Sequence, residues 1–291
     1  MGKLEKRYLP WIYLFLFPSL VIFALFYVWP IIQVSITSFT RWNGMGTPEF
    51  IGFRNYTRLF TMSSFSVSVK NLALWSLIAA TIHVGFGILV ALIFFKAPPG
   101  WKIVRTAFMV PMVISGAAWA MIYRFLFNNE FGLINHFVRI FKPDFSVNWF
   151  FQSPSAFWAI TFTWVFYAVV VTMVVLADLL AIPTDVHDAA RIDGANGWQM
   201  LTTIYLPLCR FSIGTSVIMS VTSRISMFEA IALTSRGGPG DDTMALSLIL
   251  VRSLTDYNYG LANATAVIMF IIGMIIMTGV NRLFKMNESV Y

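Results

Sequence analysis

Long apolar runs constrain this chain more than any other feature, because six of them occur within 291 residues. Hydrophobic residues make up 58% of the sequence and charged residues only 11%, whereas an ordinary soluble domain has about 25% charged residues. A run of about 20 apolar residues can cross a hydrocarbon core about 30 Å thick as a helix, which satisfies its own backbone hydrogen bonds there. The sequence therefore predicts an all-α polytopic membrane protein, folded as one transmembrane domain over residues 1–291. We expect its spans at about 11–39, 71–95, 106–123, 155–182, 211–233 and 261–281.

Charged residues predict how these spans are oriented. The basic start and the apolar run after it are too long for a cleaved signal, so we expect a retained first span. With both chain ends in the cytoplasm, the cytoplasmic segments carry ten Lys and Arg in 58 residues, and the outside segments carry nine in 89. This bias predicts cytoplasmic termini and a cytoplasmic loop at 183–207. Because the basic residues flank spans, the net charge of +7 indicates contact with lipid headgroups and no nucleic-acid partner.

Motifs for catalysis are missing from the sequence. It contains no phosphate-binding loop, no H-E-x-x-H and no G-x-S-x-G, and its three histidines lie in three different segments. The single cysteine, Cys209, excludes an intrachain disulfide. We therefore expect no enzyme and no cofactor or metal bound by this chain, so that any ATP chemistry belongs to another polypeptide.

One polar segment, 183–207, separates the fourth and fifth spans. Pro183 ends the fourth span, Thr184 or Asp185 can cap a new helix, and Gly194 suits the left-handed residue that closes it. The resulting helix, 185–193, is too short to be stable alone, so it needs a partner. A second amphipathic turn, 198–206, stops at Pro207. From the residues alone, a solvated linker is as good an interpretation as a helix that fits into a groove on another protein.

The spacing within this segment resembles the E-A-A loop of binding-protein-dependent ABC importer permeases. Asp188-Ala189-Ala190 is followed at fixed offsets by Gly194, Ile204 and Leu206-Pro207. In that family the loop is a coupling helix that docks on an ATPase subunit. The resemblance implies that the coupling residues here are Asp188, Ala189, Ala190, Asp193 and Gly194. Asp188 stands where the family usually has Glu, which keeps the charge but shortens the side chain by one methylene.

Three further stretches are similar to the carbohydrate-uptake permeases, in particular to the larger permease subunit of maltose-type importers. They are FIGFRNYTRLF (50–60), FGLINHF (131–137) and LTSRGGPGDDT (233–243), and the last resembles the family's L-T-x-G-G-P signature with one extra residue. The resemblance implies import of a sugar, expected to be an oligosaccharide, across the bacterial cytoplasmic (inner) membrane. It also implies these partners: a second permease, two ATPase subunits that bind ATP and Mg, and an extracytoplasmic binding protein docking near Gly237, Gly238 and Pro239.

Arg224 is the clearest candidate for a substrate contact, because an ionisable side chain inside a span costs about 2.5–3.5 kcal/mol on insertion. It can grip a substrate carboxylate or ring hydroxyls, which would suit an acidic oligosaccharide, or it can form a structural ion pair with a neighbouring helix or subunit. Glu229 lies about 140° further round a continuous helix, so we do not expect it to face Arg224. The predicted pathway residues are Trp164, Tyr167, Ser223, Arg224, Ser226 and Met227, with Trp119 as a weaker candidate.

Two other classes of protein compete with an importer subunit. A secondary carrier that works alone would place several acidic groups or broken helices at the bilayer midplane and show paired repeats. Here Glu229 is the sole carboxylate expected well within a span, and no repeat is evident. A structural membrane scaffold would not explain the five-element motif.

Overall fold

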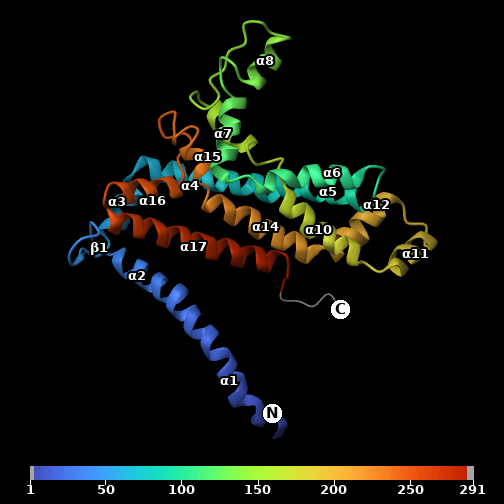
Figure 1. Cartoon of the computed structure of the whole chain (residues 1–291), viewed down its shortest axis with the longest axis horizontal. Coiled ribbons are helices and arrows are strands. Elements are labelled where there is room, and N and C mark those ends of the chain that lie inside the picture. Colours follow the sequence, from blue (N-terminus) through green and yellow to red (C-terminus); the bar gives the residue numbers. More distant parts are fainter. Residues whose placement is uncertain (1–2, 287–291) are drawn as a thin grey trace. The chain divides into compact units, whose positions relative to one another are not determined.

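A computed structural model describes residues 3–286, with side chains placed from residue 11 onward. Helices form nearly all the regular structure of these residues, and one antiparallel pair of two-residue strands completes it (Figure 1). The chain divides into two compact units, which we describe separately: Met1–Thr61 with Leu250–Phe270, and Met62–Ile249 with Ile271–Tyr291. The predicted all-α fold class is confirmed.

Three helical stretches are long and apolar enough to cross a membrane: Trp11–Thr37, Ser63–Phe95 and Tyr259–Leu283. Three bent pairs of helices also pass this test, with bends of 105°, 72° and 69°. These pairs are Trp101–Val113 with Gly116–Leu126, Val169–Ala181 with Thr184–Ile192, and Gly197–Leu208 with Arg210–Ile225. By length and composition the described residues therefore contain three candidate spans, or up to six if each bent pair is one span. Six were expected, but two of these pairs include parts of 183–207, which was expected to be a cytoplasmic loop. The predicted cytoplasmic chain ends lie partly outside the described residues.

The structure corrects three of the expected spans, because each is broken. The third, expected at 106–123, consists of α6 (Trp101–Met109), a 3-10 turn η3 (Val110–Val113) and α7 (Gly116–Leu126). The fourth, expected at 155–182, consists of α9 (Ser155–Phe162) and α10 (Val169–Ala181). The fifth, expected at 211–233, is α14 (Arg210–Ile225) followed by α15 (Glu229–Ala232). Hydropathy stays high across these breaks, which is why apolar runs did not predict them.

The first unit begins with one long apolar helix, which is followed by a short pair of strands. The helix comprises α1 (Lys3–Phe23), the π-helical turn η1 (Ala24–Val28) and α2 (Trp29–Thr37). Strand β1 (Thr40–Arg41) pairs with β2 (Glu49–Phe50), and α3 (Arg54–Thr61) follows. The unit also holds the end of α16 (Leu246–Thr255) and the start of α17 (Tyr259–Leu283).

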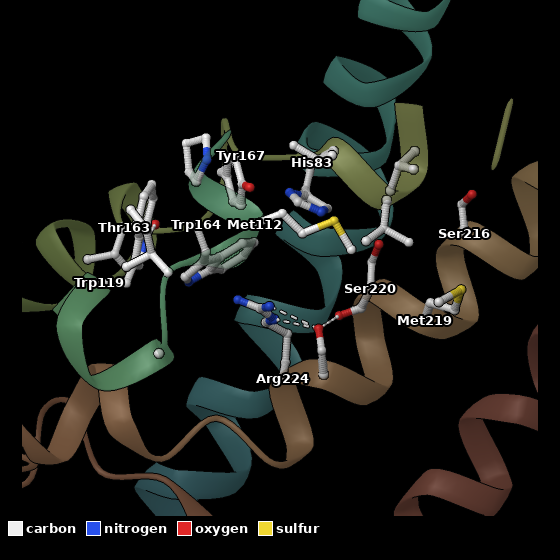
Figure 2. A pocket seen from close by; sticks show the side chains of 17 residues that line it. His83, Met112, Trp119, Thr163, Trp164, Tyr167, Ser216, Met219, Ser220 and Arg224 are labelled. Carbon is white, nitrogen blue, oxygen red and sulfur yellow. Dashed lines mark hydrogen bonds between the residues drawn. The ribbon is translucent and has the colours of Figure 1, made fainter. Parts of the chain in front are cut away.

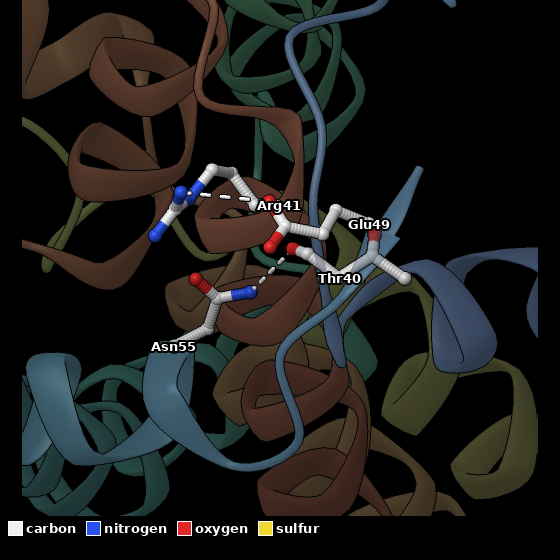
Figure 3. Close-up of polar contacts among 4 residues, drawn as sticks. All are labelled: Thr40, Arg41, Glu49 and Asn55. Carbon is white, nitrogen blue, oxygen red and sulfur yellow. Dashed lines mark hydrogen bonds and ion pairs between the residues drawn. The ribbon is translucent and has the colours of Figure 1, made fainter. Parts of the chain in front are cut away.

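Asn55 closes the end of the first span. Its side-chain amide donates hydrogen bonds to the carbonyls of Ser38 at 2.8 Å and Thr40 at 2.9 Å, and the second of these is drawn in Figure 3. Asn55 is buried, so these bonds satisfy carbonyls that the end of the helix leaves free. Gly260 permits this packing, because a Cβ there would collide with the Thr40 carbonyl. The Asn of the FIGFRNYTRLF stretch (50–60) therefore has a structural role, because it bonds the start of α3 to the segment after α2.

The second unit is built around one unbroken helical rod: α4 (Ser63–Ile78), the π-helical turn η2 (Ala79–His83) and α5 (Val84–Phe95). Helix α10 packs on α5, where the Thr172 hydroxyl donates to the Gly87 carbonyl at 3.1 Å. A small residue at 87 lets the two backbones approach closely, as in other membrane helix pairs. Trp75 is buried on α4, stacks on Phe157 of α9 and donates to the Thr161 hydroxyl at 3.0 Å.

Four short elements follow α10 and form the predicted loop 183–207: α11 (Thr184–Ile192), α12 (Gly197–Gln199), the π-helical turn η4 (Met200–Tyr205) and α13 (Leu206–Leu208). The short helix was expected at 185–193 and lies one residue earlier. Its predicted cap by Thr184 or Asp185 is wrong, because Pro183 occupies the N-cap position and no side chain caps the helix. The second turn also continues past Pro207 instead of stopping there.

The segment between α7 and α9 holds a small folded element around α8 (Leu133–Arg139). Asn135 is fully buried; its amide nitrogen donates to the Val147 carbonyl at 2.9 Å, and its amide oxygen accepts from the Trp149 indole at 2.7 Å. The FGLINHF stretch is therefore organised around its Asn.

Candidate functional site

Two neighbouring hollows lie inside the second unit, where the broken spans meet. The larger has a volume of about 440 Å³ and the smaller about 380 Å³. Helices α7, α10 and α14 contribute to the larger hollow, and the α14–α15 break contributes to the smaller. Both are lined by Gly116, Trp119, Thr163, Trp164 and Arg224. These shared residues make the two hollows one candidate pathway, shown in part in Figure 2.

Arg224 projects from the last turn of α14 toward Trp164 (Figure 2). Its guanidinium carbon lies 4.1 Å from the centroid of the Trp164 ring, which is a cation–π contact. Two of its nitrogens donate to the Ser223 hydroxyl, at 2.9 and 3.2 Å. Among the described residues no carboxylate pairs with it. The described part of the chain therefore gives Arg224 no carboxylate partner, and its contact with a substrate or another subunit stays a prediction.

Three buried polar atoms in the wall of the larger hollow have no hydrogen-bond partner within residues 3–286: the Trp164 indole nitrogen and the hydroxyls of Tyr167 and Ser216. Leaving a buried donor or acceptor unpaired costs about 1–3 kcal/mol. Natural structures contain few such atoms, and each calls for an explanation. A polar molecule in the hollow would supply the missing partners.

The backbone breaks around the hollows are stabilised by side chains from other helices. The Trp119 indole donates to the Thr163 carbonyl at 2.7 Å, and Nδ1 of His83 lies 3.0 Å from the Val165 carbonyl. A carbonyl only accepts, so Nδ1 of His83 carries the proton in this contact. The Ser247 hydroxyl donates to the Met227 carbonyl at 2.6 Å. Non-helical backbone at membrane depth requires such internal partners.

The structure brings all six predicted pathway residues to this site. Trp164, Tyr167, Ser223 and Arg224 line the larger hollow, and Ser226 and Met227 line the smaller. Their contact with a substrate stays a prediction. Trp119, the weaker candidate, lines both hollows.

Sequence reasoning missed part of the lining on α14. Ser216, Ser220 and Ser223 line the larger hollow and follow one another at intervals of four and three residues. This spacing puts them on one face of a helix, so a stripe of small polar residues was readable in the sequence. His83 bonds to the backbone carbonyl of Val165 and also lines the larger hollow.

Glu229 lies at the start of α15 and lines the smaller hollow together with Arg224. Its carboxylate packs against Gly116, the first residue of α7. A negative charge is favourable at a helix N-terminus, because the backbone N–H groups there have no helical partners. Glu229 forms no ion pair with Arg224 among the described residues, as expected from the sequence.

The five predicted coupling residues all lie on or directly after α11. Asp188, Ala189, Asp193 and Gly194 are exposed, whereas Ala190 is buried. Contact of these five residues with an ATPase subunit stays a prediction, and the burial of Ala190 leaves Asp188 and Ala189 as the accessible part of the three-residue motif. Gly194 has φ +76°, and the N–H groups of Gly194 and Ala195 bond to Arg191 and Ala190. This is the left-handed C-terminus that the glycine predicted.

Three rings hold α11 against the rest of the second unit. His187 of α11 lies 5.8 Å from Phe95, the last residue of α5, and 5.5 Å from Tyr205 of η4, measured between ring centroids. Phe95 and Tyr205 are 5.5 Å apart, and Nδ1 of His187 lies 3.2 Å from the Tyr205 hydroxyl. We call Phe95, His187 and Tyr205 the ring cluster. It joins the short surface helix directly to the second span.

The predicted docking turn is tied to its own unit. Gly237 is buried at φ +88°, and Gly238 and Pro239 are partly exposed. The Thr243 hydroxyl donates to the Gly238 carbonyl at 2.8 Å, and the Asn71 amide of α4 donates to Asp242 and Met244. Binding-protein docking at these three residues stays a prediction.

No group of three or more His, Cys, Asp or Glu side chains is arranged to hold a metal ion within residues 3–286. The polar and aromatic groups that line the hollows are indole and phenol rings, serine and threonine hydroxyls, the Arg224 guanidinium, the His83 imidazole and the Glu229 carboxylate.

Comparison with known proteins agrees with this geometry. Residues 83–288 match the model of the family described as "Binding-protein-dependent transport system inner membrane component". The chain belongs to this family. It is thus a multi-pass inner-membrane permease component, and the resemblance to carbohydrate-uptake permeases is confirmed.

Individual relatives span nearly the whole chain. The probable ABC transporter permease protein YurN of Bacillus subtilis is 31% identical over 284 residues, covering 95% of this chain and 97% of YurN. The trehalose/maltose transport system permease protein MalF of Thermococcus litoralis is 28% identical over 274 residues, covering 93% and 92%. The fold is similar to a chain of a bacterial alginate ABC transporter in complex with an alginate pentasaccharide-bound periplasmic protein. That similarity has a TM-score of 0.79 and 23% identity, covering 96% of this chain and 94% of the other.

Proposed function

We propose that this chain is the membrane-spanning permease subunit of an ATP-driven importer of oligosaccharides that carry carboxylates. The observation that carries the acidic specificity is Arg224, a guanidinium at the wall of the pathway with no carboxylate partner in the described chain. A substrate carboxylate fits a guanidinium through two parallel hydrogen bonds. The substrate would then supply the charge that the protein lacks.

The remaining lining supports a saccharide. Trp119, Trp164 and Tyr167 present aromatic rings to the hollow, and the apolar faces of sugar rings pack on such surfaces. The unpaired indole and hydroxyl groups of the wall can bond to sugar hydroxyls. Relatives named for trehalose/maltose, and a similar fold named for alginate, support this substrate class.

Transport by alternating access would be driven from outside the chain. In this proposal α11 is the coupling helix, with exposed Asp188 and Ala189 facing an ATPase subunit in the cytoplasm. Two ATPase subunits would hold ATP and Mg, a second permease would complete the pathway, and an extracytoplasmic binding protein would deliver the ligand. Both chain termini would be cytoplasmic. Closure of the ATPase pair would move α11 and, through the ring cluster, the second span.

The test is uptake by the complete transporter in proteoliposomes, with a uronic-acid trisaccharide and a neutral trisaccharide of the same length. Arg224→Ala should lower uptake of the acidic substrate at least tenfold and spare the neutral one, because a lost charge-assisted hydrogen bond costs about 1.5–3 kcal/mol. Arg224→Lys should lose less, since it keeps the charge but not the planar fork.

Trp164→Phe is the matched control, because it removes the indole N–H and replaces the two-ring indole by a smaller phenyl ring while keeping an aromatic face for the guanidinium. It should affect both substrates alike. Equal loss of both substrates in Arg224→Ala would show that Arg224 is structural and refute the acidic specificity. Failure of the wild-type transporter to import either sugar would refute the saccharide assignment as well.

A further inference from the structure

The first unit contains a polar hollow of its own, with a volume of about 660 Å³. It is bounded by β1, β2, the start of α3 and the turn between α16 and α17. The lining is rich in arginine, asparagine and aromatic side chains. It consists of Arg41, Trp42, Asn43, Met45, Thr47, Glu49, Ile51, Arg54, Asn55, Arg58, Asp256, Tyr257 and Asn258.

Positive charge dominates this hollow. Arg41 pairs with Glu49 at 3.5 Å, and both side chains are about two-thirds exposed (Figure 3). Arg54 and Arg58 lie one turn apart on α3, are exposed, and have no ion pair or hydrogen-bond partner among the described residues. Asp256 is the one other carboxylate that lines the hollow. Apart from the Arg41–Glu49 pair, the hollow is therefore lined by two guanidinium groups, of Arg54 and Arg58, and by one carboxylate, of Asp256.

The frame beneath these arginines is rigid. Asn55, between them in the sequence, is buried and bonded to two carbonyls at the end of the first span. The Trp42 indole donates to the Gly46 carbonyl at 3.2 Å, and the Tyr259 N–H donates to the Trp42 carbonyl at 2.9 Å. When a partner binds here, the conformational entropy lost by this part of the chain would therefore come mainly from the side chains of Arg54 and Arg58.

The directions in which apolar and basic side chains point from α3 help to decide whether a lipid or a protein would bind in this hollow. Phe60 of α3 is 63% exposed, and Phe53, which directly precedes the helix, is 71% exposed. At about 100° per residue, Arg54 and Arg58 point about 120° and 160° away from Phe60. If the two phenylalanines enter the lipid interface, the arginines turn away from the headgroups and toward the aqueous phase. A water-soluble acidic partner fits this arrangement better than a phospholipid.

We propose that Arg54 and Arg58 form a docking surface for carboxylates on the extracytoplasmic binding protein. This proposal rests on the proposed function, because it requires this end of the first span to face outward. The family description makes transport binding-protein-dependent, and the similar solved fold was captured with a periplasmic protein. Trp42 and the 65% exposed Tyr257 line the same hollow and offer apolar area beside the charges. Arginine and large aromatic residues are the side chains that dominate binding energy at interfaces.

The experiment measures binding of the cognate binding protein to the complete transporter in nanodiscs, at low and high salt. Arg54→Glu combined with Arg58→Glu should weaken binding at least tenfold at low salt, because it places like charges against each other. Wild-type affinity should fall as salt rises, and the double variant should lose that dependence. Arg54→Lys with Arg58→Lys, which keeps the charges, should bind within about threefold of wild type.

The matched control is Lys96→Glu with Lys102→Glu, the same change in charge at two exposed residues on the predicted cytoplasmic side. It should leave binding unchanged. In uptake assays, excess binding protein should rescue the α3 double variant but not Arg224→Ala, which separates failure of docking from failure of the proposed pathway. Wild-type affinity and salt dependence in the α3 double variant would overturn the proposal. Unchanged docking with loss of copurified anionic phospholipid would overturn it in favour of a lipid site.

Discussion

Replacing Phe95 by Ala should disconnect the short surface helix α11 from the second span. Phe95 makes two ring contacts in the ring cluster, with centroid distances of 5.8 Å to His187 and 5.5 Å to Tyr205. An aromatic pair contributes about 0.5–1.5 kcal/mol beyond the area that it buries, so the substitution removes about 1–3 kcal/mol. A coupling free energy of about 1–3 kcal/mol corresponds to roughly a 5- to 150-fold change in an equilibrium. The docked state of α11 should lose population by that factor, since nine residues cannot hold a helix alone.

The assay compares sugar uptake with ATP hydrolysis in the same proteoliposomes. Weak docking of α11 should let the ATPase turn over without moving the pathway, so Phe95→Ala should lower the number of sugars imported per ATP at least fivefold. Tyr205→Phe keeps the ring and removes only the hydroxyl that contacts His187, so its effect should be smaller, about 0.5–1.5 kcal/mol.

Ile93→Ala is the control for Phe95→Ala, because Ile93 is on the same helix and 48% exposed. It should leave the ratio of uptake to hydrolysis unchanged. A wild-type ratio in Phe95→Ala, with the transporter still assembled, would refute the role of the ring cluster in transmission.

Two further predictions concern the predicted coupling and docking residues. Asp188→Arg reverses an exposed charge on α11 and should abolish uptake and substrate-stimulated ATP hydrolysis while the protein still reaches the membrane, which fractionation and uptake assays can show. Normal uptake would count against α11 as the coupling helix. Gly237→Ala should lower thermal stability, because a left-handed residue costs about 1–2 kcal/mol with a Cβ and that Cβ would lie 2.9 Å from Leu248. Gly240→Ala, left-handed but in open space, should pay only the backbone cost, and an equal loss in both variants would exclude the predicted contact with Leu248.

Local signals made α11 predictable from sequence. Proline before a helix and glycine after it act within a few residues, and the structure has Pro183 at the N-cap and Gly194 at φ +76°. Its docking against the chain was not predictable, because Phe95 is far away in sequence from His187.

The broken spans escaped prediction for a related reason. Hydropathy describes whether a side chain prefers water or lipid, and it contains no information on which donor forms a hydrogen bond with a given backbone carbonyl. The break at 163–168 is stabilised by Trp119 and His83, which are 44 and 82 residues from the carbonyls that they contact. The break after Arg224 is stabilised by Ser247, 20 residues from its partner Met227. Such partners appear only when the chain is folded, whereas the polar residues that line the pathway were recognisable by type.

The energetics of Arg224 connect these breaks to specificity. Arg224 lies in the last turn of α14, where the helix dipole stabilises a cation by about 0.3–1 kcal/mol and at most about 2. The Trp164 face adds about 0.5–2 kcal/mol. Taking a charge out of water costs several kcal/mol, so these two contacts do not fully compensate it. In a continuous span the guanidinium would lack the stabilisation by the helix end. A substrate carboxylate in the pathway would supply the stabilising free energy that is still missing. The break in the helix would in this sense contribute to the proposed preference for an acidic substrate.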